Sequence, residues 1–126
     1  SINKKKIIFY EHKKWFFSKI KEKNSFMWIY FYKKKNPCGL IRIEKKLNQY
    51  FLSYLLDTKY RGKKISKTMI NEAISEFIII KSRVKKIYAE VVSDNLISLK
   101  VLKSIGFVQI INNNATLIKL YYEIKK

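Results

Sequence analysis

Several residue types that mark particular protein classes are scarce in this chain. Its 126 residues include one cysteine, one proline, one histidine and three glycines. A single cysteine, Cys38, cannot form an internal disulfide, which agrees with a reducing, cytoplasmic environment. One histidine and one cysteine are too few for a zinc site, so no metal is expected. Because no proline- or glycine-rich linker divides the sequence, we expect a single domain over residues 1–126.

Long apolar runs are also missing. No run approaches the roughly 18 residues that a transmembrane helix needs. The lysine-rich start leads into Ile7–Tyr10 and then into charged residues again, which is not the pattern of a secretory leader. The chain is nevertheless 48% apolar and 15% aromatic. This composition is typical of a folded domain with no membrane partner.

Acidic residues are few, and they leave a large positive charge. Nine acidic side chains oppose 28 basic ones, which gives a net charge of +19. Twenty-five of the cations are lysines spread along the chain and only three are arginines, whereas recognition of bases and bidentate recognition of phosphates favour arginine. We therefore interpret the charge as a solvated lysine surface and expect no specific nucleic-acid partner.

The apolar pattern predicts a mixed α/β fold with one mostly antiparallel sheet and helices on both faces. The third strand is apolar almost throughout, which indicates burial on both faces. The strand–helix–strand unit over 50–92 implies a right-handed crossover and a parallel strand pair. The last strand carries Leu120, Tyr121 and Tyr122, which we expect to be exposed and to suit a homodimer. The expected order is helix, three strands, helix, strand, helix and two strands, over 11–23, 26–32, 40–44, 50–57, 66–80, 87–92, 95–105, 108–111 and 116–124.

Residues 55–67 carry the strongest functional pattern. An apolar strand turns through Arg61 and Gly62 among several cations and runs directly into a helix. This arrangement aims backbone N–H groups and the positive end of a helix at one point, which suits a diphosphate. A second element follows at a fixed separation, with Asn95 and Ser98 before a helix that ends at Gly106.

These two elements resemble motifs of the GCN5-related N-acetyltransferase (GNAT) superfamily. The segment 60–66 looks like the acyl-CoA loop R/Q-x-x-G-x-G/A, and Asn95…Ser98…Gly106-Phe107 looks like N-x-x-A/S…G-F. The resemblance covers residues 26–111. It departs from the family where Lys64 replaces a glycine and where Ser66 is the last small residue of the loop. We expect Ser66 to cap the following helix.

The resemblance implies acetyl-CoA as co-substrate, bound where a central parallel strand pair splays apart. The strand and loop would hold the pantetheine arm and the diphosphate, and the second helix would hold the pantetheine or nucleotide end. The residues expected to bind the cofactor are Leu55, Leu56, Asp57, Arg61, Gly62, Lys63, Lys64, Ile65, Ser66, Lys67, Asn95, Ser98 and Lys103.

Acyl transfer to an amine needs a base for the ammonium group and an acid for the leaving thiolate. We predict Glu90 as the base, because it precedes Asn95 by five residues on the fourth strand, where some related enzymes carry a glutamate. Many relatives place the acidic tyrosine at the position of Leu102. The acid is therefore unidentified, with solvent, Tyr121 and Tyr122 as candidates.

The acceptor is suggested by Glu11-His12-x-x-Trp15-Phe16. This element resembles a branch of the family that acetylates nucleotide-linked 4-amino sugars in pseudaminic-acid biosynthesis, so His12 and Trp15 are expected to bind a small amine such as a UDP-amino sugar. Relatives begin with a further strand and helix that are not found here. Two alternatives remain open. One is a ribosomal-protein or peptide N-terminal acetyltransferase, and the other is a non-catalytic acyl-CoA- or nucleic-acid-binding module.

Overall fold

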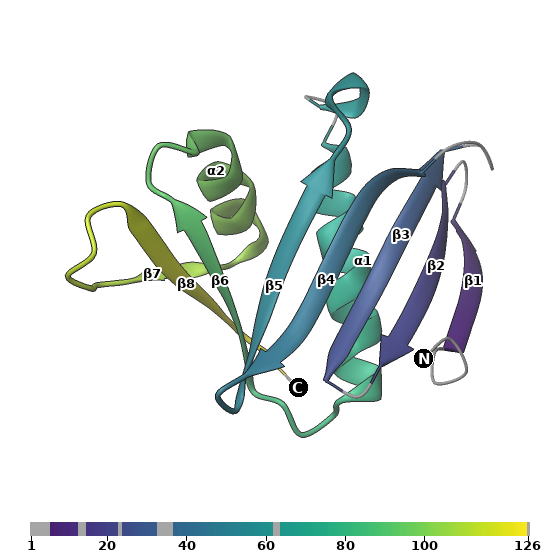
Figure 1. The fold of residues 1–126 in the computed structure, drawn as a ribbon, viewed down its shortest axis with the longest axis horizontal. Helices are drawn as coiled ribbons and strands as arrows, with labels where there is room; N and C mark the ends of the chain where they lie inside the picture. The colour runs from purple at the N-terminus through teal and green to yellow at the C-terminus, as the bar shows by residue number, and fades with distance from the viewer. Residues whose placement is uncertain (1–5, 13–14, 23, 33–36, 62–63, 126) are drawn as a thin grey trace.

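A computed structural model describes residues 6–12, 15–22, 24–32, 37–61 and 64–125 of the chain (Figure 1). Its elements are a curved sheet, two α-helices and one short 3-10 helix. In chain order they are β1 (Lys6–His12), β2 (Trp15–Glu22), β3 (Ser25–Tyr32), β4 (Pro37–Lys46), β5 (Gln49–Leu56), η2 (Thr58–Tyr60), α1 (Ile65–Ile80), β6 (Lys86–Val92), α2 (Leu96–Ile105), β7 (Val108–Ile110) and β8 (Leu117–Glu123).

The sheet contains eight strands in the order β1-β2-β3-β4-β5-β6-β8-β7. Every neighbouring pair is antiparallel except β5 and β6, which are parallel and joined through α1. This arrangement confirms the predicted mixed α/β class with a mostly antiparallel sheet. From β3 onward, the elements are those expected from the sequence pattern, with shifts of one to three residues at most ends.

Alternation along the strands separates a buried face of the sheet from an open one. On β3, Phe26, Trp28 and Tyr30 are at most 1% exposed, and the residues between them are half-buried. On β6, Ile87 and Ala89 are buried, while Glu90 is exposed. Since successive side chains point to opposite faces, one face of the sheet forms the core and the other carries the remaining side chains.

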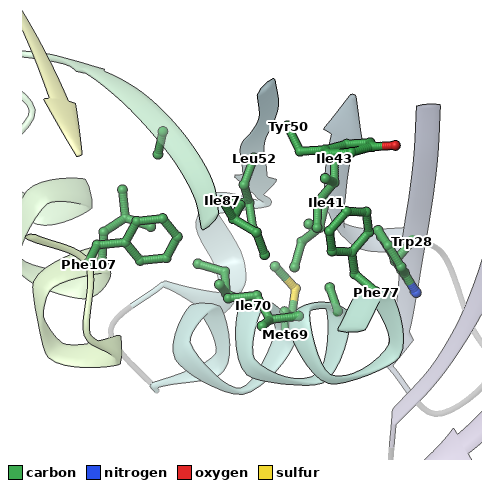
Figure 2. Packing of buried hydrophobic residues seen from close by; sticks show 14 of the residues in the cluster. Trp28, Ile41, Ile43, Tyr50, Leu52, Met69, Ile70, Phe77, Ile87 and Phe107 are labelled. Carbon is green, nitrogen blue, oxygen red and sulfur yellow. The ribbon is translucent and has the colours of Figure 1, made fainter. Parts of the chain in front are cut away.

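Both helices pack on this buried face. The apolar residues of α1 meet those of β4, β5 and β6 in one cluster (Figure 2). The Tyr30 hydroxyl donates a hydrogen bond of 2.9 Å to the Met69 carbonyl of α1. On the α2 side, Phe107 packs against Tyr122 with ring centroids 5.4 Å apart. Helices were expected on both faces, but in the part of the chain that the structure describes they lie on one.

The helix predicted over residues 11–23 is wrong. Backbone pairing makes β1 and β2 an antiparallel hairpin, with His12 opposite Trp15, and β2 continues onto β3. The segment is rich in aromatic and β-branched residues, which favour strands. The apolar spacing that predicted a helix is therefore overridden by pairing along the edge of β3.

The expectation of a third strand buried on both faces is wrong. On β5, Tyr50 and Leu52 share one face and are at most 8% exposed, but on the other face Phe51 is half-buried and Leu55 is 69% exposed. The expectation of an exposed final strand is also wrong, because Leu120 is fully buried and Tyr122 is half-buried against Phe107. A homodimer therefore stays a prediction without this support.

The contact between α1 and β4 is close. A Cβ atom added at Gly39 would overlap the Sδ of Met69 and lie 2.9 Å from its Cε. Glycine therefore leaves room for the end of the Met69 side chain against the strand at this point. Neither α-helix in the described ranges is long and apolar enough to span a membrane.

Candidate active site

The parallel pair β5–β6 is joined at only one end. Tyr50 pairs with Ile87 and Phe51 with Tyr88, and the pairing stops there. Figure 1 shows the two strands diverging from this point. Residues 52–56 of β5 and 89–92 of β6 no longer pair with each other, and we call these two stretches the divergence. The predicted splay is confirmed.

The pairing of β5 with β4 determines which peptide groups point into the divergence. The Asp57 N–H donates to the Cys38 carbonyl at 2.8 Å, so Asp57 is bonded toward β4. Hydrogen-bonded and non-hydrogen-bonded pairs alternate along an antiparallel ladder. The N–H and C=O groups of Tyr54 and Leu56 therefore point toward β6, and those of Leu55 point toward β4. Of the three strand residues predicted to bind the cofactor, Leu56 alone presents its peptide groups to the divergence, and Tyr54 was missed.

Beyond β5 the chain turns into α1 through a left-handed residue. The helix begins after Lys64, whose φ of 60° and ψ of 17° are those of a left-handed conformation. No side chain makes a capping hydrogen bond at this start. Ser66 lies inside the first turn of the helix rather than at the N-cap position. The expectation that Ser66 caps the helix is therefore wrong. The first N–H groups of α1, those of Ile65, Ser66 and Lys67, are left as donors for another partner.

The charge around this start is positive. Lys59, Arg61, Lys64 and Lys67 are all exposed, and the first turn of α1 contains no acidic residue. The nearby carboxylate of Asp57 accepts the Lys59 N–H at 3.0 Å. Among the predicted loop residues, Gly62 and Lys63 lie outside the described ranges. The uncapped N–H groups and the cations together fit an anionic group such as a diphosphate.

The second helix begins on the other side of the divergence. The Asn95 Oδ1 accepts the Ser98 N–H at 3.1 Å, so the Asn95 side chain caps α2 through its oxygen, and its predicted contact with the cofactor stays a prediction. The Ser98 hydroxyl shares a hydrogen bond of 2.7 Å with the Tyr54 hydroxyl of β5. Lys103 is exposed in the last turn of α2. It lies about 10 Å along the helix from the first turn.

Glu90 lies on the face of β6 opposite the helices. Its side chain is exposed, and across the sheet it pairs with Lys119 of β8. Two positions earlier on the same strand, the ring of Tyr88 packs 5.7 Å from that of Phe51. The Lys119 Nζ lies 5.1 Å and 5.5 Å from the centroids of these two rings. We call Phe51, Tyr88, Glu90 and Lys119 the open-face cluster.

His12 and Trp15 lie apart from these residues. They occupy the β1–β2 hairpin, and Trp15 is the backbone partner of Tyr32 at the end of β3. This is the same end of the sheet as the divergence. Strands β3 and β4 nevertheless lie between β2 and β5. At the usual strand spacing, the backbones of β2 and β5 are therefore about 14 Å apart. The structure does not bring these two residues together with the loop and the divergence.

The remaining titratable candidates lie in poor positions for catalysis. Cys38 is 2% exposed, and burial raises the pKa of its thiol to about 11, with Asp57 as a further cause. At neutral pH this thiol is protonated and a poor nucleophile. Tyr121 and Tyr122 pair with Tyr88 and Ile87, at the end where β5 and β6 are still joined.

Two other features carry no predicted site residue. An open surface hollow of about 600 Å³ is lined by Ser82–Lys86, Glu123 and Ile124, at the joined end of β5 and β6. It is remote from the α1 start and holds none of the candidate groups. Within the described part of the chain, no three His, Cys, Asp or Glu side chains cluster closely enough to hold a metal ion.

Comparisons with known proteins agree with this architecture. The structure resembles the ribosomal-protein-S5-alanine acetyltransferase of Vibrio fischeri with a TM-score of 0.65 and 21% identity, over 79% of this chain and 61% of that one. It also resembles the spermidine N-acetyltransferase of Vibrio cholerae, solved in complex with CoA and spermine, with a TM-score of 0.67 and 20% identity, over 79% of this chain and 66% of that one.

This chain therefore spans about three fifths to two thirds of these two proteins. Comparison with curated protein sequences finds no match. The family description "Acetyltransferase (GNAT) domain" matches residues 8–108. With the splayed strand pair and the uncapped α1 start in place, the chain belongs to the GNAT acetyltransferase domain family.

Proposed function

We propose that this chain is an acetyl-CoA-dependent N-acetyltransferase. The observation that carries the proposal is the continuous path from the peptide groups of Tyr54 and Leu56 to the uncapped start of α1. The peptide groups of β5 would hydrogen-bond the pantetheine amides in the way that they would bond a neighbouring strand. The N–H groups of residues 65–67 would bond the diphosphate. Bound there, acetyl-CoA supplies an activated acyl group. The buried Cys38 fits a cytoplasmic location.

The base in this proposal is Glu90. An amine attacks a thioester only in its neutral form, so a carboxylate must accept the proton that the amine loses. Glu90 is exposed on the strand that borders the divergence, where an acceptor can reach it from the open face.

For the acceptor we propose a nucleotide-linked amino sugar. The open-face cluster offers two neighbouring aromatic rings, tilted by 37° to each other, with a lysine close to both. Rings and cations of this kind suit a planar base and a phosphate. The net charge of +19 disfavours a polyamine or a basic peptide. An N-terminal peptide acetyltransferase is the second candidate, and it is supported by Glu90 and the Asn95 element alone.

The test is release of CoA thiol from acetyl-CoA in the presence of a UDP-linked amino sugar, an alanine-ended peptide or spermidine. We expect turnover with the amino sugar to exceed the other two by at least tenfold. Glu90→Gln should lower kcat by roughly a hundredfold with unchanged acetyl-CoA affinity. Glu123→Gln is the matched control, because Glu123 is also an exposed strand glutamate. Acetyl-CoA binding without thiol release from any acceptor would support a non-catalytic module instead.

A further inference from the structure

The position that carries an acidic tyrosine in many relatives cannot supply a proton here. Leu102 is 1% exposed and belongs to the central apolar cluster. Tyr121 and Tyr122 lie at the joined end of β5 and β6. Where the protein rather than solvent protonates the departing sulfur, the donor then lies on another element that borders the divergence.

Tyr54 borders it directly. Its peptide groups point toward β6, and its side chain lies on the same face of β5 as Tyr50 and Leu52, toward the helices. The ring is half-buried against the core, and its hydroxyl reaches the Ser98 hydroxyl at 2.7 Å. This contact joins β5 to α2 across the divergence, although the two residues are 44 positions apart in the sequence.

Ser98 is held in place for this contact. Its N–H is bonded to the Asn95 Oδ1 at 3.1 Å, in the first turn of α2. Ser98 therefore has a fixed backbone, and its side chain is half-buried. A serine hydroxyl both donates and accepts, so it can hold the tyrosine hydroxyl in place and donate a hydrogen bond to the phenolate that forms when the tyrosine gives its proton away.

We propose that Tyr54 is the general acid of the acyl transfer and that Ser98 is its positioning residue. As the amine nitrogen bonds to the acetyl carbon, the carbon–sulfur bond breaks and its electron pair leaves on sulfur. The Tyr54 hydroxyl donates its proton to that sulfur, the Ser98 hydroxyl donates a hydrogen bond that stabilises the resulting phenolate, and solvent returns the proton to Tyr54. The inference rests on the proposed function, because it requires the thioester to lie beside β5.

The test compares Tyr54→Phe with Tyr50→Phe. Both residues lie on the same face of β5, but Tyr50 is buried at the joined end and packs against Phe77. Tyr54→Phe should lower kcat by roughly a hundredfold with acetyl-CoA affinity within twofold of the native value. Tyr50→Phe should stay within threefold of the native kcat. Ser98→Ala should lower kcat by about tenfold without a matching change in KM, and Ser98→Thr should restore it.

A binding measurement that needs no turnover gives an independent result. If Tyr54 donates to sulfur, the native protein should bind CoA several times more tightly than desulfo-CoA, and Tyr54→Phe should abolish this preference. A Tyr54→Phe protein with native kcat and native preference for CoA would overturn the inference while leaving the proposed function intact. If the native protein binds neither acetyl-CoA nor CoA, the proposed function itself fails.

Discussion

The two helices begin on either side of the same divergence, yet their first turns are built differently. At α2, the Asn95 side chain accepts the Ser98 N–H and satisfies a donor that would otherwise be free. At α1, Lys64 adopts a left-handed conformation and no side chain caps the start. A capped start favours stability of the protein alone, whereas an uncapped start leaves donors for a ligand. We infer that α1 is the end that binds the diphosphate and that the capped first turn of α2 holds Ser98 in place.

The largest expected effect comes from placing a negative charge at each start in turn. Ser66→Glu puts a carboxylate in the first turn of α1, where it should compete with the diphosphate and raise the acetyl-CoA Kd by about tenfold. Leu96→Glu makes the same change in the first turn of α2, at a side chain that is 71% exposed. Isothermal titration should show a Kd within twofold of native for this control. Equal effects at both positions would contradict the assignment of α1 as the binding end.

Removing the side-chain cap of α2 should cost stability. Asn95→Ala deletes the oxygen that bonds the Ser98 N–H, and a lost cap of this kind costs about 1 kcal/mol. Urea unfolding followed by circular dichroism measures the change. Asn113→Ala is a useful comparison, because Asn113 is an exposed asparagine of the β7–β8 connection rather than one at a helix start. If Asn95→Ala unfolds at the native midpoint, the capped start of α2 contributes nothing.

Relieving the backbone strain at the start of α1 should have the smallest effect on the free energy of unfolding, and it should stabilise the protein rather than destabilise it. Glycine adopts a positive φ without the steric cost of a Cβ atom, so Lys64→Gly should stabilise the protein by about 0.5 kcal/mol. Lys67→Gly removes the same charge within the helix and should destabilise by about 1 kcal/mol. The same urea series compares the two. A destabilising Lys64→Gly would mean that the lysine conformation costs nothing at this position.

Much of the fold was accessible from local sequence signals. The Gly106 end of α2 and the apolar stripe of α1 each have a local physical cause, and both are present. The segment with β1 and β2 was mispredicted, because the spacing of Trp15, Phe16 and Ile20 suits a helix face whereas pairing with β3 makes a strand. Pairing between strands is a tertiary effect, and it overrides local spacing.

The site was predicted less completely than the fold. The anion-binding start of α1 followed from a local run of residues. The N-cap position was predicted at Ser66, whereas in the structure it is Lys64, whose side chain makes no capping hydrogen bond. Tyr54 gave no signal, because its significance comes from a contact with Ser98 and from the alternation of hydrogen bonds along β5. An aromatic residue in a strand more often indicates packing than chemistry. The sequence did indicate one element of this contact, since Ser98 belongs to the second motif.

The measurement that tests the account most directly is a backbone amide NMR titration with CoA. Binding of the diphosphate at α1 predicts large shifts for the amides of Ile65, Ser66 and Lys67, with smaller ones for Tyr54 and Leu56 on β5. The same titration with ATP at equal ionic strength controls for general attraction to lysine side chains. Shifts spread over exposed lysines, with none at the start of α1 or along β5, would contradict the central claim.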